Sequence, residues 1–369
     1  MTRGIFASTA AVQAFEGALA PDARALDVIG AAGGTLAGTL PSDVWCGVLL
    51  DPSTLLDTGG RHEHGFPASS MTRLFEIEHV EQDDVDNVRA LARRRVGVSL
   101  LSTSTAGDLS ASKYFREVLR PLDLGDELRV VLRDGPRVWG LLVFCRDAAT
   151  RPYSDADLDV AAAVGASAAG ALRRSLLLAG RDGGDVPDAP GLLTLGADLG
   201  VQSVSLTAQA LLAHIQEDAA DRPYPHAVRA LAVRSRAAAP GAVVGSRVPI
   251  AGGRWLTLHA WSLEGPMTIV SIARAEPGDL AAVILDVYGL TPREREVAQQ
   301  VLLGRATTEI GHALGLSPFT VQDHLKSVFR KAEVRSRPEF TASLFFRQYL
   351  PKLAAPPLST DGRLLTEDD

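Results

Sequence analysis

The sequence has few of the residues that mark secreted or zinc-binding proteins. Its 369 residues include only two cysteines, Cys46 and Cys145, which excludes a disulfide-rich scaffold and a multi-cysteine zinc site. Lysine is also scarce, with four residues against 33 arginines. No uncharged stretch approaches the ~20 apolar residues that a membrane span requires, and no signal peptide is visible. We therefore expect a cytoplasmic protein that does not associate with membranes.

The composition is otherwise that of a folded protein. Hydrophobic residues make up 46% and charged residues 22% of the chain, which excludes a wholly disordered protein. The net charge of −7 is unevenly distributed, because residues 288–350 hold nine Lys and Arg against six Asp and Glu. The remaining residues hold 28 against 38. Any contact with nucleic acid is therefore expected in this one basic segment.

Changes in composition divide the chain into predicted domains. Gly, Pro and Asp crowd together in residues 181–190, which is the composition of a linker. Residues 351–369 contain three prolines and end on acidic residues, which predicts a flexible tail. The predicted folded domains cover residues 1–180, 191–275 and 286–350.

Residues 1–180 are predicted to combine helices and strands. Val44 to Leu50 and a second run near Leu55 are predicted strands joined by a turn. Asp134-Gly135 lies between two apolar runs and predicts a hairpin. Ser154, followed three residues later by Asp157, predicts a capping box at the start of a long helix.

The late hairpin, the Tyr-Ser-Asp-x-Asp-Leu start and the closing helix resemble a GAF domain over about residues 38–178. The resemblance implies a small-ligand sensor module, with its ligand-binding residues unknown. The order of predicted elements over residues 191–275 is similar to that of a PAS domain, another sensor fold. The small residues of 164–170 are either close core packing or the seam of a dimer.

Residues 290–344 carry the sharpest pattern, which predicts four short helices. Thr291 caps the first, with Pro292 at its first position and Glu294 completing a capping box. Gly315 closes the second helix in a left-handed conformation, and Ser317 caps the third. Two short helices joined by a three-residue turn are the geometry of a DNA-binding helix-turn-helix, in which the second of the pair enters the major groove.

The motifs Thr-Pro-Arg-Glu-Arg-Glu-Val, Leu-Ser-x-x-Thr-Val-x-x-His-Leu and the later Arg-Ser-Arg resemble the C-terminal domain of LuxR-type transcriptional regulators. The resemblance covers about 60 residues and implies a four-helix domain that binds DNA as a dimer. The family usually has Ser where this chain has Ala306, so we expect Thr307 to cap the second helix instead. The family's usual basic residue after Thr-Val is here Gln322.

Residue types suggest the roles of the third helix and its surroundings. Gln322 and Lys326 are the best candidates for base edges, because Gln pairs with adenine and Lys with guanine, and Asp323 can accept from cytosine. Polar and basic residues nearby are candidates for phosphate contacts, which position the protein without specifying sequence. The predicted DNA-binding set is Thr307, Ser317, Thr320, Val321, Gln322, Asp323, Lys326, Lys331, Arg335 and Arg337.

Other chemistry has weaker signals. His62, His64 and His79 lie among glutamates, but Gly59-Gly60 and Gly65 predict a solvated loop, so no metal site is expected. The two cysteines fit buried packing better than a redox sensor, for which Arg146 beside Cys145 is weak support. No nucleophile–base constellation or phosphate-binding loop with its Lys is present, so we expect no enzyme and no cofactor.

Together these patterns predict a multidomain α+β protein, with GAF-like and PAS-like α/β sensor domains followed by an all-α four-helix helix-turn-helix domain. The predicted function is a transcriptional regulator that couples a sensed signal to promoter binding. The expected partners are double-stranded DNA, a second copy of the chain and a small-molecule effector. Two alternatives stay open: an enzyme with an accessory DNA module, and an adaptor whose front domains only bind protein.

Overall fold

The chain forms two compact units, one ending at Arg274 and the other beginning at Ala275. The first unit combines two antiparallel sheets with helices and the second is helical, which confirms the predicted α+β class. Within the described residues, no helix combines the length and the apolar character needed to cross a membrane. The computed structural model describes residues 2–61, 66–176, 186–217, 223–251, 254–263 and 266–348.

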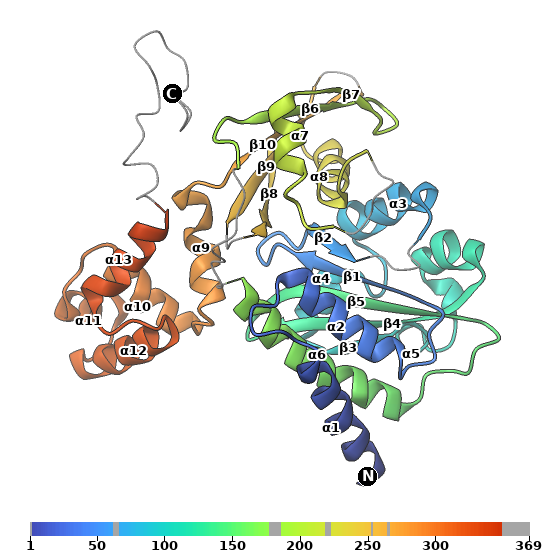
Figure 1. Cartoon of the computed structure of the whole chain (residues 1–369), viewed down its shortest axis with the longest axis horizontal. Coiled ribbons are helices and arrows are strands. Elements are labelled where there is room, and N and C mark those ends of the chain that lie inside the picture. Colours follow the sequence, from blue (N-terminus) through green and yellow to red (C-terminus); the bar gives the residue numbers. More distant parts are fainter. Residues whose placement is uncertain are drawn as a thin grey trace. The chain divides into compact units, whose positions relative to one another are not determined.

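The first unit contains two five-stranded sheets that share one strand order (Figure 1). In each sheet the second strand lies at one edge, followed by the first, fifth, fourth and third. The strands of the first sheet are β1 (Val44–Leu50), β2 (Asp57–Arg61), β3 (Val98–Leu100), β4 (Leu124–Asp134) and β5 (Arg137–Asp147). The strands of the second are β6 (Gly191–Leu195), β7 (Val201–Val204), β8 (Val244–Pro249), β9 (Trp255–Ser262) and β10 (Thr268–Arg274).

The helices α2 (Ala25–Ala37) and α6 (Asp155–Ser175) lie on the first sheet, and α1 (Thr2–Gly17) packs against these two helices (Figure 1). Glycine allows the layers to approach closely, because a Cβ at Gly165 would lie 2.5 Å from Val130. The predicted capping box of α6 is confirmed, since Ser154 N donates to Asp157 Oδ2 at 2.7 Å. Val164, Ala168 and Ala169 are fully buried and pack within the chain, whereas Ala166 of the same run is exposed.

Short helices connect β2 to β4. This region includes two π-helices, a rare conformation that is frequent at functional sites. The segments are α3 (Ala68–Phe75), the π-helix η1 (Glu76–Glu81), α4 (Val88–Arg94), α5 (Leu101–Ser104), the 3-10 helix η2 (Leu109–Ala111), the π-helix η3 (Phe115–Leu119) and the 3-10 helix η4 (Arg120–Leu122).

The predicted hairpin at Asp134-Gly135 is confirmed, because β4 and β5 pair across it and Gly135 has φ +58°. The two predicted strands joined by a turn are present, but the second lies beyond Leu55. Asp51 Oδ1 accepts from Ser53 N at 2.8 Å and closes a turn in which Leu55 has φ +57°. The strand begins only at Asp57 and includes Gly59 and Gly60, which pair with β1, so the predicted loop at these glycines is wrong.

The second sheet agrees closely with the predicted strands and is accompanied by α7 (Leu206–Leu212) and α8 (His226–Arg236). A buried ion pair joins the two sheets. Arg247 on β8 donates from Nη2 to Asp51 Oδ1 at 2.9 Å and from Nε to Asp51 Oδ2 at 3.0 Å. Asp51 is 1% exposed, so this contact fixes the sheets within one unit.

The second unit contains five helices within its described residues. The four predicted helices are present, and α9 precedes them. Their shared core includes Val297, Ile310, Val321, Leu325 and Phe340, each at most 4% exposed. The helices are α9 (Pro277–Val287), α10 (Pro292–Leu302), α11 (Thr307–Leu314), α12 (Pro318–Lys331) and α13 (Arg337–Gln348).

Candidate nucleic-acid interface

The start of each of the helices α10 and α12 is fixed by its own sequence. Thr291 N donates to Glu294 Oε2 at 2.7 Å, and Glu294 N donates to Thr291 Oγ1 at 3.3 Å, which confirms the predicted capping box. Thr320 N donates to Ser317 Oγ at 3.1 Å at the start of α12. Such caps each stabilise a helix by about 1 kcal/mol.

The predicted cap of α11 is wrong. The helix begins at Thr307, so the N-cap position belongs to Ala306, which has no side-chain acceptor. Glu309 compensates in part, because its Oε2 accepts from Ala306 N at 2.6 Å. Thr307 instead lies close to α12, where its Oγ1 accepts from Gln322 Nε2 at 3.4 Å.

The turn between α11 and α12 depends on two glycines. Gly315 has φ +63° and ends α11, as its sequence predicts. Leu316 N donates to Gly311 O at 2.8 Å, and a Cβ at Gly311 would lie 2.7 Å from Leu316 O. The absence of a side chain at Gly311 therefore lets the turn close tightly, which sets the angle between α11 and α12.

Helix α12 has a buried face and an exposed face. Val321, Leu325 and Val328 are at most 4% exposed and pack inside the unit. The opposite face carries Phe319, Gln322, Asp323, Lys326 and Arg330, all exposed, at the helical spacing of three, four and seven residues. This face offers hydrogen-bond donors, an acceptor and an aromatic ring to solvent.

The predicted DNA-binding residues differ in exposure. Val321 is fully buried, so it supports α12 from inside the unit and is not available at its surface. The exposed members of the set are Ser317, Gln322, Asp323, Lys326 and Arg335. The half-buried members are Thr307, Thr320, Lys331 and Arg337.

Two of the predicted cations make contacts within the unit. Lys331 Nζ donates to Glu294 Oε2 at 2.6 Å and to Gly289 O at 3.1 Å. Arg337 Nη1 donates to the main-chain oxygen of Arg305. Lys326 is less restrained, since its ammonium lies 3.6 Å from Asp323 and its side chain is 77% exposed. Of the three predicted cations Lys326, Lys331 and Arg337, Lys326 is therefore the most available to a ligand.

Glu294 fastens α12 to α10. Besides Lys331, its carboxylate accepts from Ser327 Oγ at 2.6 Å. Burial opposes ionisation of this carboxyl, but the hydrogen bonds from Lys331, Ser327 and Thr291 outweigh it and lower its pKa to about 2. A paired and ionised Glu294 thus holds the exposed face of α12 in place.

Sequence reasoning did not include Phe319, the most exposed aromatic residue of α12. Its side chain is 76% exposed. The sequence could have identified Phe319 as part of the exposed face from its position, because residue 319 lies three residues before Gln322 and off the buried stripe. An apolar side chain at this place can contact a thymine methyl group.

The structure also describes some of the cysteines and histidines of the first unit that were considered as redox or metal sites. Cys46 and Cys145 are free and buried, and burial, together with the Glu127 carboxylate, raises the pKa of the Cys145 thiol. A buried neutral thiol is unreactive, so packing accounts for Cys145. His62 and His64 lie outside the described residues. No group of three or more candidate ligands suited to a metal ion occurs among the residues that are described.

Comparison with known proteins identifies the second unit. Residues 289–344 match the family described as bacterial regulatory proteins, luxR family. A segment of 65 residues is 38% identical to the HTH-type transcriptional regulator YhjB of Escherichia coli strain K12, covering 16% of this chain and 32% of YhjB. The chain thus matches about a third of the length of this relative. The C-terminal segment is a LuxR-family helix-turn-helix domain.

Two solved structures are similar to part of the chain. One is the GAF domain/HD domain protein from Geobacter sulfurreducens, at 19% identity and a TM-score of 0.32, covering 42% of this chain and 96% of that one. Another is the GAF domain of the cyanobacteriochrome TePixJ, at 16% identity and a TM-score of 0.29, covering 41% and 88%.

Proposed function

We propose that this chain is a transcriptional regulator that binds promoter DNA through α12 and responds to a signal received by its first unit. The observation that carries the proposal is the exposed polar face of α12, which lies opposite a fully buried stripe of the same helix. A helix presented in this way by a helix-turn-helix fits the major groove of B-DNA.

In this proposal base edges are read by Gln322 and Lys326. Both side chains are exposed, and the weak ion pair of Lys326 with Asp323 leaves the ammonium free to exchange partners. Phe319 contacts a thymine methyl at one end of the same face. Ser317, Thr320 and Arg335 contact phosphates and fix the register of the helix on the duplex.

The proposal includes a homodimer. A single short helix contacts few base pairs, so a second copy doubles the sequence that is read and the number of phosphates that are neutralised. Two-fold symmetry then predicts an operator of two inverted half-sites about one helical turn apart. The acidic balance of the remaining chain confines DNA contact to the second unit.

The first unit contributes regulation in this scheme. A signal molecule can change DNA binding only if its affinity differs between the DNA-competent and incompetent arrangements of the protein. In this proposal the signal molecule binds the first unit, in which the Asp51–Arg247 ion pair links β8 to the turn after β1.

An electrophoretic shift assay with the full chain and the DNA upstream of its own gene tests the proposal. We expect a discrete protein–DNA complex. Unlabelled copies of the same DNA should displace the labelled DNA from it at lower concentration than unrelated DNA does, and the affinity should fall steeply as the salt concentration increases. Equal competition by unrelated DNA together with no dependence on salt would contradict DNA recognition by this chain.

A further inference from the structure

Arg89 in α4 and Arg234 in α8 come near each other within the first unit. The guanidinium of Arg89 is fixed at the turn before β2, because its Nη2 donates to Thr54 O at 2.7 Å. Helix α8 packs against both β2 and η1, and Arg234 lies in its last turn. The fold thus brings together two cations from segments that are far apart in the sequence.

The charges of the two arginines act on the same surroundings. Burial lowers the pKa of Arg89, and the charges of Arg234 and Arg93 lower it further. Burial, helped by the charges of Arg89 and Arg234, also lowers the pKa of His79 in η1 to about 3. Arginine nevertheless stays protonated at neutral pH. Two like charges are therefore held close together in half-buried positions.

Neither arginine has a carboxylate partner in the part of the chain that the structure describes. There the side chain of Arg234 makes no hydrogen bond or ion pair, and that of Arg89 donates to a main-chain oxygen, which carries no full charge. The Nε of Arg89 is buried without a partner, whereas its Nη1 is unpaired but reached by solvent. Both guanidinium groups thus keep donors that a ligand from solution can use.

The acidic residues nearest to Arg89 along the chain and in the turn have other partners. Asp86 accepts from Ser99 Oγ at 2.9 Å and also pairs with a second arginine of α4. Asp51 is paired with Arg247. These carboxylates are therefore already engaged and do not balance the two charges.

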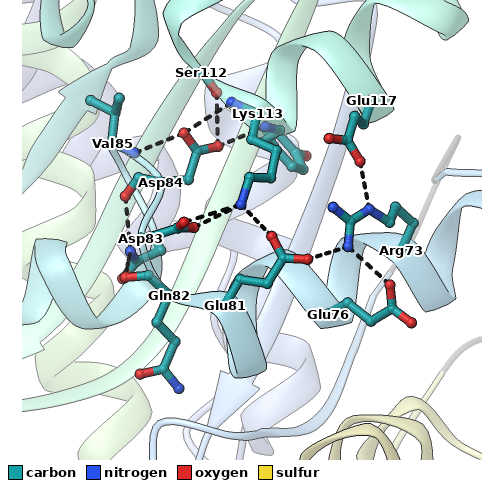
Figure 2. Close-up of polar contacts among 12 residues, drawn as sticks. Arg73, Glu76, Glu81, Gln82, Asp83, Asp84, Val85, Ser112, Lys113 and Glu117 are labelled. Atoms are coloured by element: carbon teal, nitrogen blue, oxygen red, sulfur yellow. Dashed lines mark hydrogen bonds and ion pairs between the residues drawn. The ribbon is translucent and has the colours of Figure 1, made fainter. Parts of the chain in front are cut away.

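Other cations beside η1 show the contrasting arrangement. Figure 2 shows Arg73 among three carboxylates and Lys113 between two. Those of Arg73 are Glu76, Glu81 and Glu117, and those of Lys113 are Glu81 and Asp83. The hydrogen bonds from Glu117 and Glu81 raise the pKa of Arg73, in the direction opposite to the shift of Arg89. Matched cations are thus the pattern on this side of η1, and Arg89 and Arg234 depart from it.

We propose that Arg89 and Arg234 bind a free, doubly charged oxyanion between α4 and α8. Its oxygens accept from Nη1 of Arg89 and from the guanidinium of Arg234, since the planar fork of donors on an arginine matches the oxygens of an oxyanion. The anion supplies the negative charge that the surrounding side chains do not. This site goes beyond the proposed DNA binding and does not depend on it.

The number of charges defines the class of ligand. Two guanidinium groups carry two positive charges, so a doubly charged anion balances them and a singly charged carboxylate leaves one unmatched. Removing the repulsion between the arginines adds to the hydrogen bonds that the anion makes. Because it contacts helices that accompany different sheets, the bound anion also stabilises the folded first unit.

Calorimetry with the full chain tests the proposal with inorganic phosphate and acetate as probes. Ionic strength is held constant with sodium chloride, because salt alone screens the repulsion. We expect saturable binding of phosphate at pH 8, where it is doubly charged, and binding of acetate at least about tenfold weaker.

Three variants locate the site. Arg89→Met and Arg234→Met each remove one of the two cations, and each is expected to weaken phosphate binding by about tenfold or more. The control Arg120→Met, at an exposed position of η4, is expected to bind phosphate as the wild type does. Neither Arg89→Met nor Arg234→Met leaves a carboxylate unpaired, so we expect both to fold.

The comparison of phosphate with acetate in the wild type decides the proposal even if a variant fails to fold. Uptake of no phosphate, equal binding of phosphate and acetate, or phosphate binding that is unchanged in both Arg89→Met and Arg234→Met would overturn it. A chain that binds its upstream DNA but takes up no phosphate contradicts the anion site and leaves the DNA-binding proposal in place.

Discussion

The cationic side chains of Arg129 and Lys326 lie in opposite surroundings, one buried and the other exposed to water. The side chain of Arg129 is 5% exposed and is held between Glu78 and Glu127, whereas that of Lys326 is 77% exposed and lies 3.6 Å from Asp323. Water screens the surface pair, so its loss costs little and a phosphate or base can replace the partner. The buried charge cannot exchange partners in this way. The guanidinium of Arg129 holds Glu78 and Glu127 together inside the first unit, whereas the ammonium of Lys326 is available to a ligand.

The largest effect is expected where the buried cation is removed. Arg129→Met leaves Glu78 and Glu127 buried without their partner, which we expect to destabilise the first unit by about 3–5 kcal/mol. Urea unfolding followed by tryptophan fluorescence measures it, because Trp139 is 2% exposed in this unit. The control Arg93→Met, at an exposed position of α4, is expected to change stability by less than about 0.5 kcal/mol. If Arg129→Met and Arg93→Met lowered the free energy of unfolding equally, the proposed difference between the buried and the exposed cation would be wrong.

A second test compares a buried and an exposed carboxylate of α10. Glu294→Gln is expected to destabilise the helix-turn-helix by about 2–3 kcal/mol at neutral pH, because it weakens the contacts with Lys331 and Ser327. Glu296→Gln, whose partner Arg293 is surface-exposed, should cost less than about 1 kcal/mol. Hydrogen exchange of peptides covering residues 292–331 in the full chain measures both.

The same carboxylate predicts a dependence on pH. The pKa of Glu294 is about 2 in the folded unit, below its ordinary value of 4.5. Its stabilising contribution is therefore complete above about pH 4.5 and is lost as the pH falls toward 2. Glu294→Gln should flatten this part of the stability profile, and an unchanged profile would contradict the assigned contacts.

The smallest expected effect has the opposite sign. Ala306 occupies the N-cap of α11 without a side-chain acceptor, so Ala306→Ser is expected to stabilise this helix by about 0.5–1 kcal/mol. Slower hydrogen exchange in residues 307–314 would report the gain. Ala313→Ser, within the same helix and exposed, supplies the control and should give no stabilisation.

The sequence predicted the helix-turn-helix well because its signals are local. Thr291, Ser317 and Gly315 act on main-chain atoms within a few residues, so their types alone define where helices begin and end. The cap of α11 was predicted incorrectly because Thr307 is already the first helical residue, so the N-cap position falls on Ala306.

The first unit was harder to predict because its determining contacts are distant in sequence. Gly59 and Gly60 become strand residues only through pairing with β1. The contact between Arg129 and Glu78 joins β4 to η1 across 51 positions, which periodicity cannot show. One signal was available, since Glu127 and Arg129 lie two positions apart shortly before the predicted hairpin, and residues so spaced in a strand share a face of the sheet.

The central claim, that the free charge of α12 reads DNA, is tested most directly by Lys326→Ala. In a shift assay with its own upstream DNA, we expect this variant to lose about 1–3 kcal/mol of specific binding while its stability is unchanged. Gln299→Ala, exposed on α10, should bind as the wild type does. Operator binding by Lys326→Ala equal to that of the wild type would contradict the account.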